Sequence, residues 1–159
     1  MKPLMLVLLI TLSCVQLAGC TSQQSRADML IGKTTQTELF NQFNGFAQDY
    51  QHFLVNEVQQ QQIQNWPDDI TIDVFFGTWC HDSQREVPQL LKLLSYNPNI
   101  SISLVALDYH KSEPLGLAEA NNIQFTPTFI VYRHGREMGR IIERANSSIV
   151  KDINQMLML

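Results

Sequence analysis

The chain has 159 residues, of which 45% are hydrophobic, and its 11 basic and 15 acidic residues give a formal net charge of −4 at pH 7. This length is enough for one ordinary domain with a buried core. The acidic balance and the lack of a basic cluster argue against a nucleic-acid-binding protein, so nucleic acid is not an expected partner.

The N-terminus has the features of an export signal. Lys2 precedes a run from Leu4 to Leu17 that is almost continuously apolar. At about 14 residues this run is shorter than the roughly 20 that a membrane span needs. It ends in Leu-Ala-Gly-Cys at residues 17–20, which resembles the bacterial lipobox, where the cysteine is lipidated and becomes the mature N-terminus. The alternative is an ordinary secretory signal in which Cys20 has no role.

The lipobox resemblance implies a signal peptide at residues 1–19, a lipidated Cys20 with a tether over residues 20–35, and a domain over residues 36–159. It implies a bacterial cell-envelope protein that is anchored to a membrane through the lipid on Cys20 and faces the periplasm. Because Thr21 rather than aspartate follows the cysteine, the resemblance favours the outer membrane over the inner membrane.

Lipidation changes the number of free cysteines. Cys14 leaves with the signal peptide and Cys20 carries the lipid, so Cys80 is the only free thiol of the mature chain. An intramolecular disulfide then cannot form, although the compartment is oxidising. Cys80 is therefore either buried and inert or kept reactive toward a partner.

Polar residues 21–33 predict the tether, and a helical region is predicted after it. Thr35 and Glu38 fit a capping box, and apolar residues follow at helical spacing: Leu39, Phe43, Phe46, Tyr50 and Phe53. They predict one helix from about residue 36 into the fifties, with this stripe packed in the core rather than forming a ligand surface. Residues 58–66 are predicted to continue as helix, which Pro67 ends.

Strands and helices alternate from residue 70 onward. Two buried strands are predicted at Ile70–Phe76 and Ile100–Leu107, and helices are predicted at residues 81–95 and 115–121. A hairpin and a closing helix follow: strands at 128–132 and 137–142 around His134-Gly135, then a helix to about residue 157 capped by Asn146 or Ser147. A parallel βαβ unit followed by a hairpin and a helix predicts an α/β fold.

The motif with the most chemical content lies where the first of these strands meets its helix. Residues 79–83 read Trp-Cys-His-Asp-Ser, Glu86 and Pro88 follow, and Thr126-Pro127 precedes a later strand. These residues resemble the thioredoxin family, most closely its membrane-tethered TlpA/ResA-like branch. The resemblance covers roughly residues 70–157. It implies a thioredoxin-like fold, with a central mixed sheet flanked by helices and, in this chain, an N-terminal helical extension.

Cys80 is the candidate nucleophile. It falls at the predicted start of a helix, where unpaired N–H groups and the helix dipole stabilise a thiolate. The carboxylate of Asp82 would oppose this by like-charge repulsion, and His81 would assist when protonated. The alternative is a buried structural cysteine.

Ser83 is the main departure from the family, which has a second cysteine there. That second thiolate normally attacks the mixed disulfide and releases the substrate, and a hydroxyl cannot do this. Ser83 can instead donate a hydrogen bond to the Cys80 thiolate, or be an ordinary first-turn residue. Classical members also carry a buried aspartate six residues before the first cysteine, where this chain has Val74. Asp73 is one place away and so points to the opposite face of the strand.

The resemblance implies roles for four further residues. Glu86 matches a glutamate that tunes the dithiol in the TlpA/ResA-like branch; the alternative is a solvated helix carboxylate. Thr126 and Pro127 match the cis-proline loop, in which the backbone before the proline pairs with an extended substrate. Trp79 is expected to contribute to substrate binding beside this loop.

Two functions from different classes follow. The first is monothiol thiol–disulfide exchange through Cys80, reducing or isomerising mixed disulfides of a protein or a small thiol. The second is a non-catalytic binding module for an envelope protein. A metal site built from Cys80, His81, Asp108 and His110 is a weaker third interpretation because the spacing is not that of a ligand set. No metal and no other cofactor is predicted.

Overall fold

The computed structural model describes residues 29–158. Five strands form one mixed sheet in the order β1-β3-β2-β4-β5, in which β2 and β3 are parallel and the other neighbouring pairs are antiparallel. The strands are β1 (Gly32–Thr34), β2 (Ile70–Phe76), β3 (Ser101–Ala106), β4 (Thr128–Arg133) and β5 (Arg136–Ile142). The helices are α1 (Gln36–Gln42), α2 (Asn44–His52), α3 (Glu57–Gln64), α4 (His81–Leu94), α5 (Leu117–Ala120) and α6 (Ile149–Met158).

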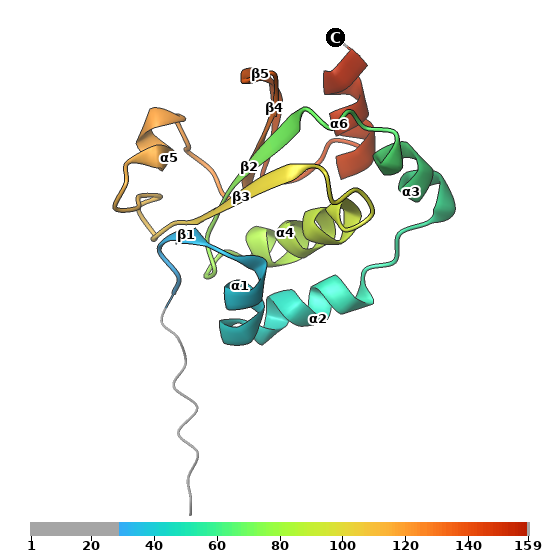
Figure 1. Ribbon diagram of the computed structural model, residues 1–159. Helices are drawn as coiled ribbons and strands as arrows, with labels where there is room; N and C mark the ends of the chain where they lie inside the picture. Colours follow the sequence, from blue (N-terminus) through green and yellow to red (C-terminus); the bar gives the residue numbers. More distant parts are fainter. Residues whose placement is uncertain (1–28, 159) are drawn as a thin grey trace, which may run out of the picture.

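The helices cover the two faces of the sheet unequally. Figure 1 shows α1 to α4 and α6 on one face and the short α5 on the other. The larger core cluster lies under the first group, where β2 contributes Ile72, Val74 and Phe76. Phe75 points to the opposite face and packs in a smaller cluster with Ala118 of α5. The predicted fold class, a mixed sheet flanked by helices with an N-terminal helical extension, is therefore confirmed.

Strand β1 was not predicted from the sequence, which placed these residues in the tether. Gly32 lies opposite Ala106 and Thr34 opposite Leu104, so β1 forms the edge of the sheet beside β3. A three-residue strand is too short to show a period of two, and only the pairing with β3 defines it. The sheet therefore begins before residue 36.

The N-terminal helical region is broken twice, whereas the sequence predicted one continuous helix. Phe43 leaves the helical conformation, with φ −124° and ψ 82°, and separates α1 from α2. Helix α3 has its own start, because Asn56 and Gln59 form a capping box with hydrogen bonds of 2.9 and 3.1 Å. The Asn-x-x-Gln pattern at residues 56–59 could have predicted this start.

The last helix begins one or two residues later than predicted. The hydroxyl of Ser148 accepts a hydrogen bond from the Lys151 N–H at 3.3 Å, as a capping side chain does. Asn146 and Ser147, the predicted caps, precede this start. Their backbone N–H groups donate to the Asp152 carboxylate at 2.7 and 3.3 Å.

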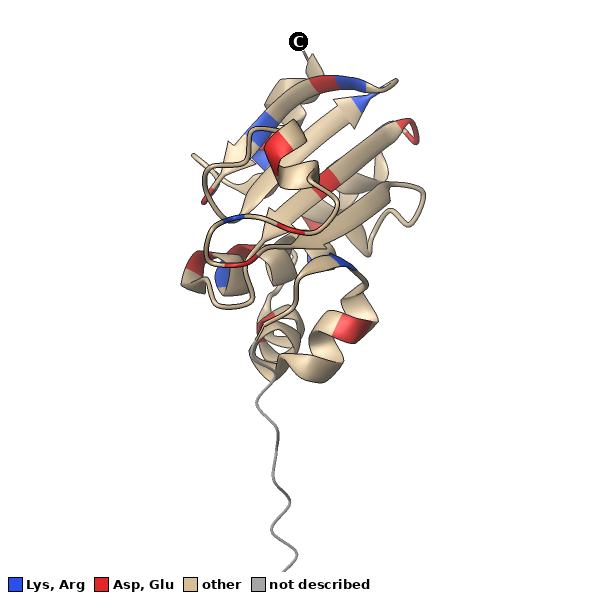
Figure 2. Ribbon diagram, turned by 90° about the vertical axis from the view of Figure 1, so that its left-hand side faces the viewer, with Lys and Arg blue, Asp and Glu red and all other residues tan. Residues whose placement is uncertain are grey.

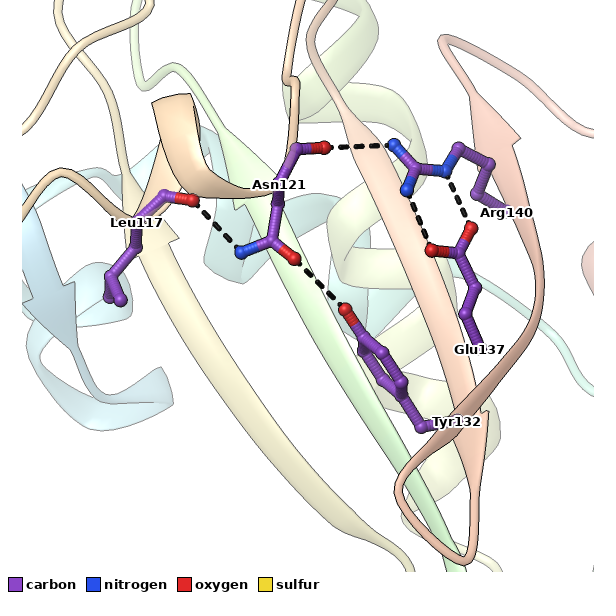
Figure 3. A network of polar contacts seen from close by, with 5 residues as sticks. All are labelled: Leu117, Asn121, Tyr132, Glu137 and Arg140. Atoms are coloured by element: carbon purple, nitrogen blue, oxygen red, sulfur yellow. Dashed lines mark hydrogen bonds and ion pairs between the residues drawn. The ribbon is translucent and has the colours of Figure 1, made fainter.

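Polar contacts hold α5 against the hairpin of β4 and β5 (Figure 3). The Tyr132 hydroxyl donates to the Asn121 side chain at 3.0 Å, and that side chain donates to the Leu117 carbonyl at 2.9 Å. Arg140 donates to the Asn121 carbonyl at 3.1 Å and pairs with Glu137. The guanidinium of Arg140 lowers the pKa of Glu137 by hydrogen bonding. This network fixes the loop that leads into β4.

We expect Asn97→Ala to lower the free energy of unfolding by about 1–3 kcal/mol. Asn97 is buried, and its amide donates to the carbonyls of Ile63 and Trp66 at 3.0 and 3.4 Å, where α3 ends. Alanine would remove this donor from both carbonyls, and that of Ile63 alone would keep another, the Trp66 N–H at 3.1 Å. Urea unfolding measures the difference, with Asn99→Ala as the control because that side chain is exposed and pairs with Asp68. Equal effects of the two substitutions would contradict the expectation.

The stability of the sheet should also depend on pH through Asp73. Burial raises the pKa of Asp73, and the charge of Lys33 offsets this in part. Because the folded-state pKa lies above the unfolded one, the folded state is favoured while the group is protonated, and this contribution is lost as pH rises through the folded-state value. We therefore expect Asp73→Asn to stabilise the fold at neutral pH and not below the unfolded pKa. Urea unfolding at both pH values tests this; a gain of the same size at both would contradict it.

Candidate functional site

Cys80 lies between β2 and α4 and is the N-cap residue of that helix, with φ −88° and ψ 123°. Its carbonyl accepts the first helical hydrogen bond from Gln84 at 3.0 Å, and its N–H closes a turn onto the Gly77 carbonyl at 3.0 Å. The thiol is free and partly exposed. The Cys80 side chain makes no capping hydrogen bond to the first turn of α4. The thiol lies at the N-terminus of that helix, a placement typical of reactive cysteines.

The loop before β4 lies directly beside this thiol. The Thr126–Pro127 peptide bond is cis, and both residues are buried. The Cys80 thiol donates to the Thr126 carbonyl at 3.2 Å. The structure thus brings together two of the sequence-predicted site residues that are 46 positions apart in the chain.

Ser83 occupies the position of the missing second cysteine and is fully buried. Its hydroxyl accepts a hydrogen bond from the Gly77 N–H at 3.2 Å. The hydroxyl therefore braces the turn that precedes Cys80, and the thiol itself has Thr126 as its partner. A side chain in this place has no access to solvent.

Trp79 forms one wall of the site. Its indole N–H donates to the Leu107 carbonyl at 3.0 Å, and its ring stacks on Tyr109 with 4.8 Å between centroids. The ring also covers Gly77, where a Cβ would lie 2.6 Å from it, so glycine is required there. Leu107 and Tyr109 were missed by sequence reasoning, because nothing in the local sequence indicates that the loop after β3 meets Trp79.

Glu86 is an ion-paired residue of helix α4. It is buried and accepts a hydrogen bond from Arg85 at 2.8 Å, and Arg85 also pairs with Asp82 at 2.7 Å. The hydrogen bonds that Arg85 donates raise its pKa, the one to Glu86 more than the one to Asp82. Glu86 also lines a pocket with Arg144. The carboxylate is thus ion-paired rather than solvated, and its role in tuning the Cys80 thiol stays a prediction.

The residues of the metal interpretation do not form a ligand cluster. The Asp108 carboxylate accepts hydrogen bonds from the N–H groups of His110 and Ser112 at 2.8 and 2.9 Å. Hydrogen bonding, chiefly from the Ser112 backbone, lowers the pKa of Asp108. Within residues 29–158, no three His, Cys, Asp or Glu side chains are placed to hold a metal ion.

The described part of the chain also holds no helix that is long and apolar enough to span a membrane. The predicted signal peptide and the lipidation site Cys20 lie outside the described residues. Figure 2 shows acidic and basic residues interspersed over the ribbon rather than gathered in zones of one sign.

Comparisons with known proteins agree with one another. Residues 34–154 match the family described as Thioredoxin. A thioredoxin of Geodia cydonium is 25% identical over 92 residues, which are 58% of this chain and 83% of the relative. Mitochondrial thioredoxin-2 of Schizosaccharomyces pombe is 29% identical over 75 residues, 47% of this chain and 53% of the relative, so the match spans about half of that protein.

One solved structure resembles nearly the whole described fold. A Pseudomonas aeruginosa protein of unknown function superposes with a TM-score of 0.54 at 17% identity, covering 79% of this chain and 86% of that one. At this identity the similarity concerns the fold alone.

Proposed function

Because the chain belongs to the thioredoxin family, we propose that it carries out thiol–disulfide exchange with Cys80 as its single reacting thiol. The observation that carries the proposal is the pairing of Cys80 with Thr126: a partly exposed thiol at a helix N-terminus, 3.2 Å from the carbonyl before a cis-proline. Ser83, buried at the position of a second cysteine, makes the exchange a monothiol reaction.

The reaction has two displacement steps. The Cys80 thiolate attacks one sulfur of a disulfide, so that a bond from Cys80 to that sulfur forms and the other sulfur leaves as a thiolate. A thiol from outside, or a second cysteine of the substrate, then attacks the mixed disulfide and restores the Cys80 thiolate. Two outside thiols reduce a substrate disulfide to two thiols and leave as their own disulfide, whereas attack by a different cysteine of the substrate isomerises its disulfides.

The Thr126 carbonyl can serve both the resting and the reacting state. In the resting state it accepts the hydrogen bond of the Cys80 thiol. When the thiol loses its proton, this carbonyl loses its donor and becomes available to the N–H of an extended substrate segment. Trp79, fixed by its bond to Leu107, bounds the segment on one side. Deprotonation and substrate pairing are thus coupled through one atom.

We also propose that the chain belongs to the TlpA/ResA-like branch and is anchored in a bacterial cell envelope. Trp79 to Ser83, with Pro88 in α4, fits the TlpA/ResA-like branch. The lipobox supports a signal peptide at residues 1–19 and a lipid anchor at Cys20. The anchored protein would face the periplasm, and Thr21 favours the outer membrane over the inner membrane. The tether would then run from Cys20 to the start of the sheet. Metabolic labelling with palmitate tests the anchor: wild type should take up label and Cys20→Ser should not.

A non-catalytic binding module is the second candidate function. Ser83 favours it. Its buried hydroxyl holds the turn before Cys80 in place, but it cannot release a substrate from a mixed disulfide as a second cysteine would. In that case the turn at residues 79–83 and the loop at residues 126–127 would bind an envelope protein. Partner binding that survives Cys80→Ser unchanged would support this function over exchange.

The proposed function is tested with glutathione disulfide. The mature chain from residue 20, with Cys20→Ser, has Cys80 as its only thiol. We expect mass spectrometry to find one glutathione on Cys80, retained until an outside thiol is added, because Ser83 cannot displace it. No adduct on the folded protein, with ready labelling of the unfolded chain, would contradict exchange chemistry.

A further inference from the structure

Exposed apolar side chains gather at the end of the sheet that carries Cys80. Of the eight large apolar side chains that are exposed in the described part of the chain, five lie at this end, each between 46% and 65% exposed. They are Ile31, Tyr109, Leu115, Phe125 and Ile142. The register places four of them, because Gly32 pairs with Ala106 at the end of β3 and Thr128 pairs with both Phe75 and Ile142. Leu115 follows Pro114, whose ring would lie 3.9 Å from a Cβ on Gly32. We call these five residues the apolar rim.

The N-terminal segment joins the domain at the same end. The Leu30 N–H donates to the Thr78 hydroxyl at 3.3 Å, two residues before Cys80. Figure 1 shows β1 and α1 at the end where β2 leads into α4, whereas the C-terminus of α6 lies at the opposite end of the molecule. The point of attachment is therefore part of the active-site end.

The length of chain outside the described residues limits how far this end can lie from an anchor. Leu30 lies ten positions after Cys20, and a fully extended chain spans at most about 3.5 Å per position, or roughly 35 Å. A domain of this size has a radius of gyration of about 14 Å. An anchor at the C-terminus would place the width of the domain between the membrane and Cys80, whereas the N-terminal anchor does not.

We propose that the apolar rim faces the membrane surface and that the substrate is a disulfide in the membrane-proximal segment of a membrane-anchored protein. This rests on the proposed function, both the exchange at Cys80 and the anchor at Cys20. Aromatic side chains such as Tyr109 suit the headgroup level of a bilayer. A shared membrane also raises the effective concentration of a disulfide held near its surface. Exchange there follows the same two steps, with the partner's second sulfur as the first leaving group.

The test compares two ways of holding the protein on vesicles. Phosphatidylcholine vesicles contain a phosphatidylethanolamine whose headgroup carries a 2-pyridyl disulfide. Attack by Cys80 joins its sulfur to the lipid sulfur and releases pyridine-2-thione, which absorption records. One protein is the native chain lipidated on Cys20. The other is the mature chain with Cys20→Ser, held on nickel-chelating lipid by a C-terminal hexahistidine after a spacer of matched length.

We expect the N-terminally anchored protein to release pyridine-2-thione about tenfold faster on vesicles, and both proteins to react equally with soluble glutathione disulfide. Equal rates on vesicles, with normal reaction in solution, would overturn the inference and leave the proposed function intact. If neither protein reacts with glutathione disulfide, the proposed function fails and the inference falls with it.

A pair of substitutions tests the rim itself. Leu115→Ser removes a rim side chain, and Leu54→Ser removes an equally apolar exposed side chain from the loop between α2 and α3. We expect Leu115→Ser to lower the vesicle rate about two- to threefold without changing the glutathione rate, and Leu54→Ser to change neither. Identical vesicle rates for the two variants would count against a rim that touches the membrane.

Discussion

Replacing Cys80 by serine is expected to reduce thiol–disulfide exchange to the uncatalysed rate. Cys80 is the only cysteine in the described residues, and a serine hydroxyl can neither attack a disulfide at neutral pH nor form a mixed disulfide. The rate is measured as reduction of a glutathione-peptide mixed disulfide by excess glutathione, followed by chromatography. The loss should be complete rather than partial, because Ser83 offers no second thiol that could take over.

The control for this prediction is the stability of the variant. Serine keeps the size and the hydrogen-bonding capacity toward Thr126, so the free energy of unfolding should change by no more than about 1 kcal/mol. Retained exchange in the well-folded Cys80→Ser protein would contradict the proposed mechanism.

Replacing Ser83 by cysteine is expected to convert the monothiol site into a dithiol site. Residues three apart on a helix are neighbours, and Cα separations of about 4.4–6.8 Å suit a disulfide. An attacking thiol held in place has an effective concentration of at least about 10⁵ M. The glutathione adduct of Cys80 should therefore decay by internal displacement, at a rate about a hundredfold or more above that of the wild-type adduct. Insulin reduction with dithiothreitol should also appear as a new activity.

A matched control separates the effect of a thiol at residue 83 from the effect of a second thiol elsewhere in the protein. Ser95→Cys places the thiol at the other end of α4, where the side chain is exposed and bonds only to the Lys92 carbonyl. This variant should keep a stable adduct on Cys80. A Ser83→Cys protein whose adduct is as long-lived as that of Ser95→Cys would show that the turn does not present residue 83 to the sulfur.

Much of the fold could be predicted because its signals are local. The bounds of β2, Ile70–Phe76, are those that its apolar run predicts, and the hairpin turn lies at His134-Gly135 as expected. Strand β1 could not be predicted, because its three residues are defined by pairing with β3. The break at Phe43 lies directly before Asn44-Gly45, a dipeptide typical of turns that could have predicted it. Packing of Phe46 against Phe76 accompanies the change of direction.

The site was predictable in its sequence motifs and not in its long-range contacts. The family resemblance led to Cys80, Thr126 and Pro127, and the structure places the first two in hydrogen-bond contact. The bond of Trp79 to Leu107 joins residues 28 positions apart and has no local signal. The ion pair of Glu86 joins it to its sequence neighbour Arg85, and nothing in the spacing to Cys80 indicated that pair.

The most direct test of the central claim, that Cys80 is a reactive thiol, is its rate of alkylation by iodoacetamide across the pH range. The protein is the mature chain with Cys20→Ser, measured folded and in concentrated urea. A reactive thiol at a helix N-terminus should make the folded protein react about tenfold faster than the unfolded chain at neutral pH. A folded protein that reacts no faster than the unfolded chain would contradict the claim and leave the binding module as the function to pursue.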